Sequence, residues 1–274
     1  MFLFYSGYGI YEQVKAKGKS YVRSFLPHRF LPTYASFAIC VFFYFVLSLV
    51  LRAGYPVRQV LLSFIGWESI GNSNWFMFVT FALYAIFMLS FSITKNNEAG
   101  LVLFTVLSVL LAALLFVLKE SWWWNTLLCF TLGMWWSRFR ERIETVLFKS
   151  FAVWGIAFLC IFGAFACCYI FGRRIPLMYV FTALFFALAV CLGTMKFEFR
   201  AGRIFAFLGS HVFSIYILQR LVFVSVAQFG LSALPAVYIL LCFVLTVLLA
   251  CSYDFCFGKM SIALQGKRAS CAAK

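Results

Sequence analysis

Three polar side chains near the C-terminus lie in a stretch that is otherwise apolar. Arg220 directly follows Gln219 within Ile204–Gln228, and Tyr216 precedes Arg220 by four residues, which places Tyr216 and Arg220 on one face of a helix. A cationic side chain in such a setting is costly and is by default a functional hypothesis. We therefore consider Arg220, Tyr216 and Gln219 catalytic candidates in a site for an anion or a polar substrate. The alternative is an arginine that extends its charged end toward the turn at Gly230.

A second polar cluster lies between two apolar stretches, in the segment Trp67–Asn74. Glu68 is the acidic residue of this segment and could act as a base or orient one, so it is a further catalytic candidate. The alternative is a solvated loop in which Ser73 or Asn74 caps the helix that follows. The residues alone leave both interpretations open.

The histidines and cysteines show no spacing typical of a metal site or a catalytic triad. His28 and His211 are the only two histidines, and a lone histidine is more often hydrogen-bonded structure than a catalyst. Ten cysteines are present, but there is no CxxC pair, and most of them lie in apolar stretches, where a free cysteine behaves as a small hydrophobe. We predict neither a metal site nor a disulfide framework.

The composition places these residues in a membrane protein. Hydrophobic residues make up 65% of the 274 residues and charged residues only 11%, whereas a soluble domain is roughly half apolar and about a quarter charged. Lipid is therefore the expected solvent for most of the surface, since a spanning helix needs about 20 mainly apolar residues. We predict an all-α fold, a polytopic bundle of transmembrane helices, with membrane lipid as a partner.

The chain divides into eight predicted complete spans and an N-terminal half-span. Met1–Ile10 is apolar but would cross only half a bilayer, since about ten helical residues rise about 15 Å. Val57–Gly66 is also too short to cross. We find no internal repeat or low-complexity segment, so residues 1–274 are predicted to form a single domain. The complete spans are Phe30–Leu51, Trp75–Ile93, Ala99–Leu118, Ser121–Ser137, Ser150–Phe171, Leu177–Met195, Ile204–Gln228 and Ala236–Tyr253.

The distribution of positive charge predicts the orientation. With the basic segment Lys15–Arg29 in the cytoplasm, 17 of the 23 Lys and Arg residues fall in cytoplasmic segments, as the positive-inside rule requires. We therefore attribute the net charge of +15 to the cytoplasmic segments of a protein of the cell membrane, and not to nucleic-acid binding. The same basic segments could hold an anionic donor such as a coenzyme A phosphate, or they could serve topology alone.

Five short segments of the chain resemble, in their order and spacing, the sequence motifs of one known protein family. Phe4–Ile10 resembles an FFxxSGY element that ends a span, and Tyr21–Pro32 resembles the cytoplasmic RxxRxxP element that follows it. Asn74–Phe76 resembles a Trp-containing start of a later span, and Leu132–Met134 resembles a short span with a glycine. Leu208–Gln219 resembles an LGxxSxxIYLLH element near the C-terminus. Together these segments resemble the family-3 membrane acyltransferases, which are integral membrane O-acyltransferases.

The resemblance implies a membrane acyltransferase that transfers groups other than amino-acyl groups. It would move an acyl group, usually acetyl, from cytoplasmic acyl-CoA to a hydroxyl. The acceptor would be a glycan such as a polysaccharide, or a lipid-linked sugar, and no metal is implied. Arg29 matches the second arginine of RxxRxxP and would help hold the donor, with Arg23 as a second donor-binding residue. Tyr216 and Gln219 match positions of the LGxxSxxIYLLH element.

Three departures from the family pattern bear on activity. Leu26 stands where the first arginine is expected, and Gln219 replaces the final histidine. The family's catalytic histidine lies in the span before the FFxxSGY element, so we expect a member that lacks the first span and part of the second. An active enzyme known from an incomplete sequence and an inactive relative both remain open. A transporter or lipid-linked-glycan carrier with a site around Arg220 is the alternative function.

Overall fold

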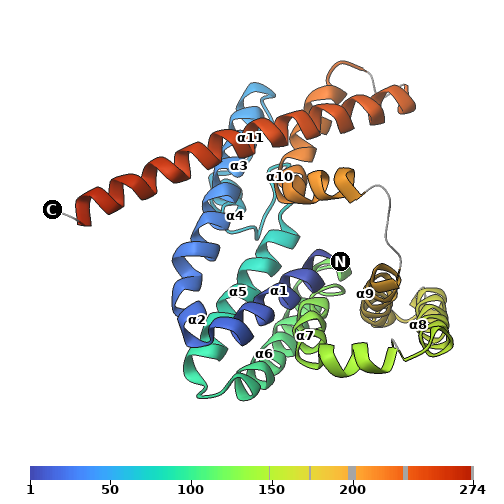
Figure 1. Ribbon diagram of the computed structural model, residues 1–274. Coiled ribbons are helices and arrows are strands. Elements are labelled where there is room, and N and C mark those ends of the chain that lie inside the picture. The colour runs from blue at the N-terminus through green and yellow to red at the C-terminus, as the bar shows by residue number, and fades with distance from the viewer. Residues whose placement is uncertain (148, 173, 197–201, 231–233, 273–274) are drawn as a thin grey trace. The chain divides into compact units, whose positions relative to one another are not determined.

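The computed structural model is helical along most of the chain that it describes (Figure 1). It describes residues 1–147, 149–172, 174–196, 202–230 and 234–272, with side chains as far as residue 258. The α-helices are α1 (Phe2–Lys17), α2 (Lys19–Phe25), α3 (Leu31–Val50), α4 (Val57–Ser63), α5 (Trp75–Ile93), α6 (Asn97–Leu118), α7 (Leu128–Leu147), α8 (Phe151–Gly172), α9 (Met178–Lys196), α10 (Gly202–Ala227) and α11 (Pro235–Ala272).

Seven of the described helical segments are long and apolar enough to cross a membrane. In Phe151–Gly172 only 6% of the most apolar stretch is buried inside the protein, which suits side chains that face lipid. The seven segments are Lys19–Val50, Trp75–Ile93, Asn97–Leu118, Phe151–Gly172, Met178–Lys196, Gly202–Ala227 and Pro235–Gly258. The predicted all-α polytopic fold is therefore confirmed, with seven candidate spans in the described chain instead of eight.

The span predicted at Ser121–Ser137 accounts for the difference. Its Trp-rich first part forms a short 3₁₀ turn, Ser121–Trp123, and α7 begins only at Leu128 and continues to Leu147. The charged segment that follows Ser137, which we predicted to be a loop, is thus the second half of this helix. Because that half carries several arginines and glutamates, the apolar part of α7 is shorter than the roughly 20 residues that a span requires.

The basic segment predicted as the first cytoplasmic loop is also largely helical. It includes the end of α1, all of α2 and a π-helical turn at Leu26–Phe30 that leads directly into α3. Lys19 Nζ donates to the carbonyl oxygen of Phe91 at 2.7 Å and also to that of Thr94. These carbonyls lie at the C-terminal end of α5, where backbone acceptors lack helical partners, so the cation satisfies acceptors that would otherwise need water.

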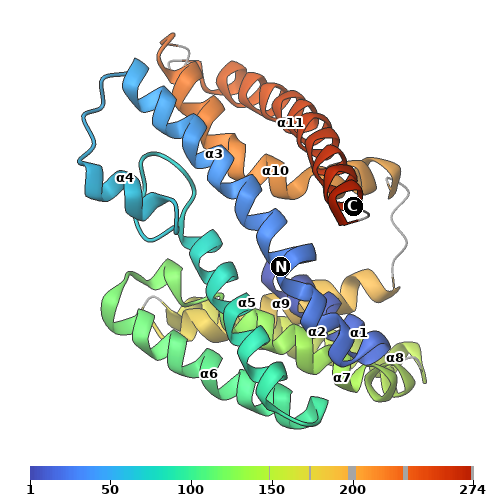
Figure 2. The ribbon, with the colours of Figure 1, turned by 90° about the vertical axis from the view of Figure 1, so that its left-hand side faces the viewer.

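The chain packs as two compact units. Unit 1 contains Met1–Leu31 and Val79–Phe199, and unit 2 contains Pro32–Phe78 and Arg200–Lys274. Within unit 1, α1 packs on α7 and α8 packs on α9. Within unit 2, α10 and α11 lie side by side (Figure 2). That the whole chain forms a single domain stays a prediction.

Two glycines bring the backbones of α1 and α7 into direct contact. A Cβ atom placed on Gly7 would lie 2.1 Å from the carbonyl oxygen of Phe130, and one placed on Gly133 would lie 2.0 Å from the carbonyl oxygen of Phe4. Both distances are far below van der Waals contact, so only glycine fits at either position. Small residues at helix contacts are a common means of close packing between helices in lipid.

Polar side chains extend the contact between α1 and α7. Glu12 accepts hydrogen bonds from Lys15 at 2.7 Å and from Ser137 at 2.8 Å, and Arg140 Nη1 donates to Tyr8 Oη at 2.7 Å. Burial acts to raise the pKa of the Glu12 carboxyl, but the hydrogen bonds from Lys15 and Ser137 outweigh it, and the pKa lies below its ordinary value. The carboxylate is therefore the form that joins the two helices.

We predict that Gly7→Ala destabilises the protein by about 1–3 kcal/mol, the usual cost of overpacking, because the new methyl group meets the Phe130 carbonyl. Gly9→Ala is the matched control on the same helix, since nothing lies within 4 Å of a Cβ atom at Gly9. Thermal unfolding in detergent should give a lower midpoint for Gly7→Ala and an unchanged or higher one for Gly9→Ala. Equal midpoints for the two variants would contradict the close contact between α1 and α7.

Candidate functional site

Within unit 2, a stripe of polar side chains on α3 faces α10 and α11. Ser36, Cys40 and Tyr44 are buried and follow one another at intervals of four residues, which places them on one helix face. Ser36 Oγ and Tyr253 Oη of α11 lie 2.9 Å apart. Cys40 Sγ and Tyr44 Oη both donate to the carbonyl oxygen of Ile217 in α10, at 2.9 and 3.2 Å. These bonds fix α10 against α3.

The segment before α5 folds into an ordered loop. Asn72 and Ser73 are buried, which contradicts the interpretation of Trp67–Asn74 as a merely solvated loop. Asn72 Oδ1 accepts from the backbone N–H of Ile70 at 3.0 Å, and the carbonyl oxygen of Asn72 accepts from Ser69 Oγ at 2.7 Å. Gln59 Nε2 of the preceding segment donates to the carbonyl oxygen of Ser69 at 2.8 Å. The loop is thus fixed by its own side chains.

The structure brings Tyr216 and Arg220 together with this loop, as the spacing of the two residues on one helix face suggested. Arg220 Nη1 donates to the carbonyl oxygen of Asn72 at 3.3 Å. The ring of Tyr216 meets that of Phe76 edge to face, with centroids 4.9 Å apart. Asn72, Tyr216 and Arg220 therefore form one polar cluster, which we call the Arg220 cluster.

The Arg220 cluster presents donors that lack acceptors. Asn72 Nδ2 is buried and has no hydrogen-bond partner in the described part of the chain, and the buried Tyr216 Oη lies near Ser73 without a hydrogen bond of good geometry. Arg220 forms no ion pair with a carboxylate among the described residues. Buried polar groups are rarely left unpaired, and each exception calls for an explanation. A ligand rich in oxygen atoms would supply the missing acceptors.

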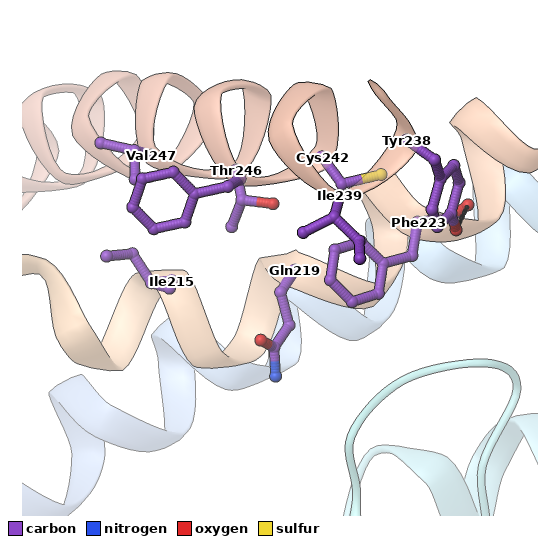
Figure 3. Close-up of a pocket in the computed structure, with 9 residues that line it drawn as sticks. Ile215, Gln219, Phe223, Tyr238, Ile239, Cys242, Thr246 and Val247 are labelled. Carbon is purple, nitrogen blue, oxygen red and sulfur yellow. Dashed lines mark hydrogen bonds between the residues drawn. The ribbon is translucent and has the colours of Figure 1, made fainter. Parts of the chain in front are cut away.

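Two of the predicted catalytic candidates lie apart from these donors. Glu68 is half-buried, and its carboxylate makes no hydrogen bond or ion pair with any described residue. Gln219 lines an apolar groove of about 240 Å³ between α10 and α11, and its carboxamide points away from α11 (Figure 3). The structure therefore unites Arg220 and Tyr216 but does not join Glu68 or Gln219 to them by a hydrogen bond.

Unit 1 contains a polar pocket of about 410 Å³ where α1 and α2 meet. Gly18 separates the two helices with a φ of 56°, a left-handed conformation that glycine adopts without steric cost. The chain can therefore turn sharply between the two walls of the pocket. The residues that line it are Gly9, Gln13, Tyr21, Ser24, Phe25, His28 and Arg29. We call it the Arg29 pocket.

The π-helical turn presents two nitrogen-bearing side chains to the Arg29 pocket. His28 Nδ1 lies 3.0 Å from the carbonyl oxygen of Ser24; because a carbonyl can only accept, Nδ1 carries the proton in this bond. π-Helical turns inside α-helices occur frequently at functional sites. Arg29, predicted to bind the donor, lines the pocket, whereas Arg23, predicted for the same role, is exposed and is not among the lining residues.

Tyr84 connects two of the motif segments within unit 1. The Tyr84 hydroxyl interacts with the Arg29 side chain, and it lies 3.3 Å from Ser6 Oγ. Ser6 belongs to the FYSGY segment and Arg29 to the RxxRxxP-like segment, so one buried tyrosine joins both. The sequence analysis did not identify Tyr84, because a tyrosine inside an apolar span carries no distinctive local signal.

The comparison with protein families identifies the family of the chain. A family model for the acyltransferase domain matches residues 1–254 of the chain. The chain belongs to the family-3 acyltransferases. No curated protein and no solved structure matches it significantly. The predicted resemblance is therefore confirmed. The function of the chain is that of a membrane acyltransferase.

In unit 2 of this acyltransferase, His211 and Asp254 form a polar pair that the sequence analysis did not predict. His211 Nδ1 lies 2.5 Å from Asp254 Oδ2, and Ser214 Oγ donates to Asp254 Oδ1. His211 was considered a structural histidine, and Asp254 was not singled out. The sequence does contain a signal that could have identified Asp254: it lies near the end of an apolar span, where acidic residues are rare.

We predict opposite effects on stability for two buried tyrosines of unit 2. Tyr44→Phe removes a hydrogen bond to the Ile217 carbonyl and should lower the free energy of unfolding by about 0.5–1.5 kcal/mol. Tyr216→Phe removes a hydroxyl without a partner, so the free energy of unfolding should stay unchanged or rise. Denaturant unfolding in detergent measures both. Equal destabilisation would show that the Tyr216 hydroxyl is bonded within the protein.

Proposed function

We propose that the protein is an O-acyltransferase that moves an acyl group, usually acetyl, from acyl-CoA to a hydroxyl of a glycan or lipid-linked sugar. The observation that carries the proposal is the Arg29 pocket, in which a motif arginine lies beside histidine, serine and glutamine side chains. The family assignment favours group transfer over the transporter that we considered from sequence alone.

The Arg29 pocket suits the phosphate end of acyl-CoA. A guanidinium group offers several N–H donors in a planar arrangement that matches phosphate oxygens. Gln13 and Ser24, which line the same pocket, add neutral hydrogen-bonding groups. The orientation predicted from charge places this basic end of unit 1 in the cytoplasm, where acyl-CoA is found.

The Arg220 cluster suits the acceptor. Its unpaired groups are the Tyr216 hydroxyl, which can donate or accept, and the Asn72 amide N–H, which can only donate. Sugars present many hydroxyl oxygens, and lipid-linked sugars add phosphate oxygens that a guanidinium group can bind.

The transfer itself needs a hydroxyl oxygen to attack the carbonyl carbon of the thioester. An O–C bond forms, the C–S bond breaks, the attacking hydroxyl loses its proton and the departing thiolate gains one. Positioning of the two reactants can contribute several kcal/mol to catalysis. In the proposed function, the Arg29 pocket and the Arg220 cluster contribute binding and orientation of donor and acceptor.

We predict that Arg29→Ala raises the KM for acyl-CoA by about 10- to 100-fold, because hydrogen bonds to charged groups contribute about 1.5–3 kcal/mol each. The assay supplies radiolabelled acetyl-CoA to membranes that contain the protein and measures acetyl esters on the glycan. Arg23→Ala is the matched control, since it removes the same charge from a neighbouring position outside the pocket. Similar KM values for the two variants would show that charge alone, and not the pocket, attracts the donor.

For the acceptor site, we predict that Arg220→Met lowers transfer at limiting acceptor concentration and leaves the KM for acyl-CoA unchanged. Arg220→Lys should recover part of the loss, because lysine keeps the charge but not the planar donor geometry. Initial rates at varied acceptor concentration separate the two effects. If Arg220→Met retains both activity and acceptor affinity, Arg220 merely extends toward the membrane surface.

A further inference from the structure

We propose that the acceptor of this enzyme carries a single hydrocarbon chain, linked to its sugar through a phosphate, and that the apolar groove between α10 and α11 holds this chain. The inference rests on the proposed function and selects, from the two acceptor classes named there, the lipid-linked sugar. It concerns only unit 2, which contains both helices and the Arg220 cluster.

The groove is apolar and lies between two candidate membrane spans. Its volume is about 240 Å³, and on α10 it is lined by Ile215, Gln219 and Phe223, which follow one another at intervals of four residues (Figure 3). These three residues share one helix face and extend over about 12 Å of the α10 axis. On α11, the lining residues Ile239 and Phe243 are 66% and 55% exposed, so a lipid chain can enter the groove from the side.

The size and the lining of the groove suit part of one hydrocarbon chain. Pockets for whole small molecules usually have volumes of about 300–1,000 Å³, which exceeds this groove. Thr246 contributes a buried hydroxyl without a partner in the described chain, but most of the wall is apolar, and a sugar there would lack hydrogen bonds. A groove of this volume favours a lipid with one chain over a membrane phospholipid, which has two.

The groove and the Arg220 cluster lie on adjacent faces of the same part of α10. Successive residues of an α-helix are rotated by about 100°, so Tyr216 lies about 20° and Arg220 about 60° around the axis from Phe223. Arg220 precedes Phe223 by three residues, which corresponds to about 4.5 Å along the axis. A phosphate bound at Arg220 can therefore belong to the molecule whose chain lies in the groove.

Arg220 has the position and the charge that a lipid phosphate requires. It donates to the carbonyl oxygen of Asn72, which lies three residues before the candidate span that begins at Trp75, so the guanidinium group is near one end of that span. Lipid phosphates lie at this level, outside the hydrocarbon core that contains their chains. From here the groove runs toward Ile215 and Val247, away from the end of α10 and the start of α11. No described carboxylate pairs with Arg220, so its planar donors can bind phosphate oxygens.

The binding experiment uses tritiated farnesyl phosphate and the detergent-solubilised protein. Ile215→Trp places an indole ring in the groove and should raise the Kd by about tenfold or more, the loss that corresponds to about two buried methylene groups. Leu248→Trp is the matched control, because Leu248 of α11 is 58% exposed and does not line the groove. Arg220→Met should raise the Kd for farnesyl phosphate and leave that for farnesol unchanged. Thr246→Val should change neither, since a hydrocarbon chain forms no hydrogen bond with a hydroxyl.

Three binding results would overturn the proposal: equal Kd values for the two tryptophan variants, loss of binding in Thr246→Val, or equal competition by phosphatidylglycerol, which would identify ordinary membrane lipid as the occupant. If Ile215→Trp lowers the thermal midpoint, cross-linking of the wild-type protein with a diazirine-labelled farnesyl phosphate decides. The cross-links should fall on α10 and α11, and cross-links confined to other helices would contradict the groove.

A transfer assay separates this inference from the proposed function. Membranes with and without the protein receive a short pulse of radiolabelled acetyl-CoA. The first protein-dependent acetyl esters should partition into organic solvent with lipid-linked sugar, and Ile215→Trp should reduce them more than Leu248→Trp. Esters that appear first in water-soluble glycan would overturn the lipid-linked acceptor and leave the proposed function intact. No esters at all, with farnesyl phosphate binding intact, would overturn the proposed function and leave the groove as a lipid site.

Discussion

Lipid offers no hydrogen bonds, so a polar side chain inside a span must find its partner within the protein. Both units follow this constraint. In unit 2, hydroxyl and thiol groups of α3 bond to α10 and α11, and in unit 1 Tyr84 bonds to both Ser6 and Arg29. The same requirement that satisfies these groups therefore fixes which helices lie together. Polar side chains here determine packing as much as apolar ones do.

The exceptions to this rule are informative for the same reason. Seven buried side-chain atoms of the described chain lack a partner, and two of them, on Tyr216 and Asn72, belong to residues beside Arg220. An unsatisfied buried donor costs free energy in the unliganded protein, and that cost is recovered when a ligand supplies the acceptor. The place in unit 2 where two such atoms lie close to a guanidinium group is thus well suited to bind a polar molecule.

Apolar length was sufficient to predict most of the fold, because a run of about 20 apolar residues has few structures open to it besides a spanning helix. It failed at α7, where Arg138, Arg140 and Arg142 continue the helix instead of ending it. Charged residues with good helix propensity do not stop a helix. The bounds of such an amphipathic segment depend on its partners, here α1, and are not contained in local hydropathy.

The candidate sites were predictable only where the signal was local. Tyr216 and Arg220 lie four residues apart, so their common helix face could be inferred, and Arg29 lies in a recognisable motif. Asn72 joins them only through the folded loop, and Asp254 is 43 residues away from His211 in sequence. Contacts between distant segments require the arrangement of helices in space. The sequence accordingly indicated single residues but not the groups that they form.

One glycine has a disproportionate influence on the Arg29 pocket. Gly18 is the residue between the two helices that form the pocket walls, and its φ of 56° makes the opening depend on the torsion of one residue. No neighbouring atom lies within 4 Å of a Cβ atom at this position, so conformation and not crowding restricts it to glycine. A larger residue there would favour a different angle between the walls. The width of the Arg29 pocket is therefore adjustable at a residue that is not part of its lining.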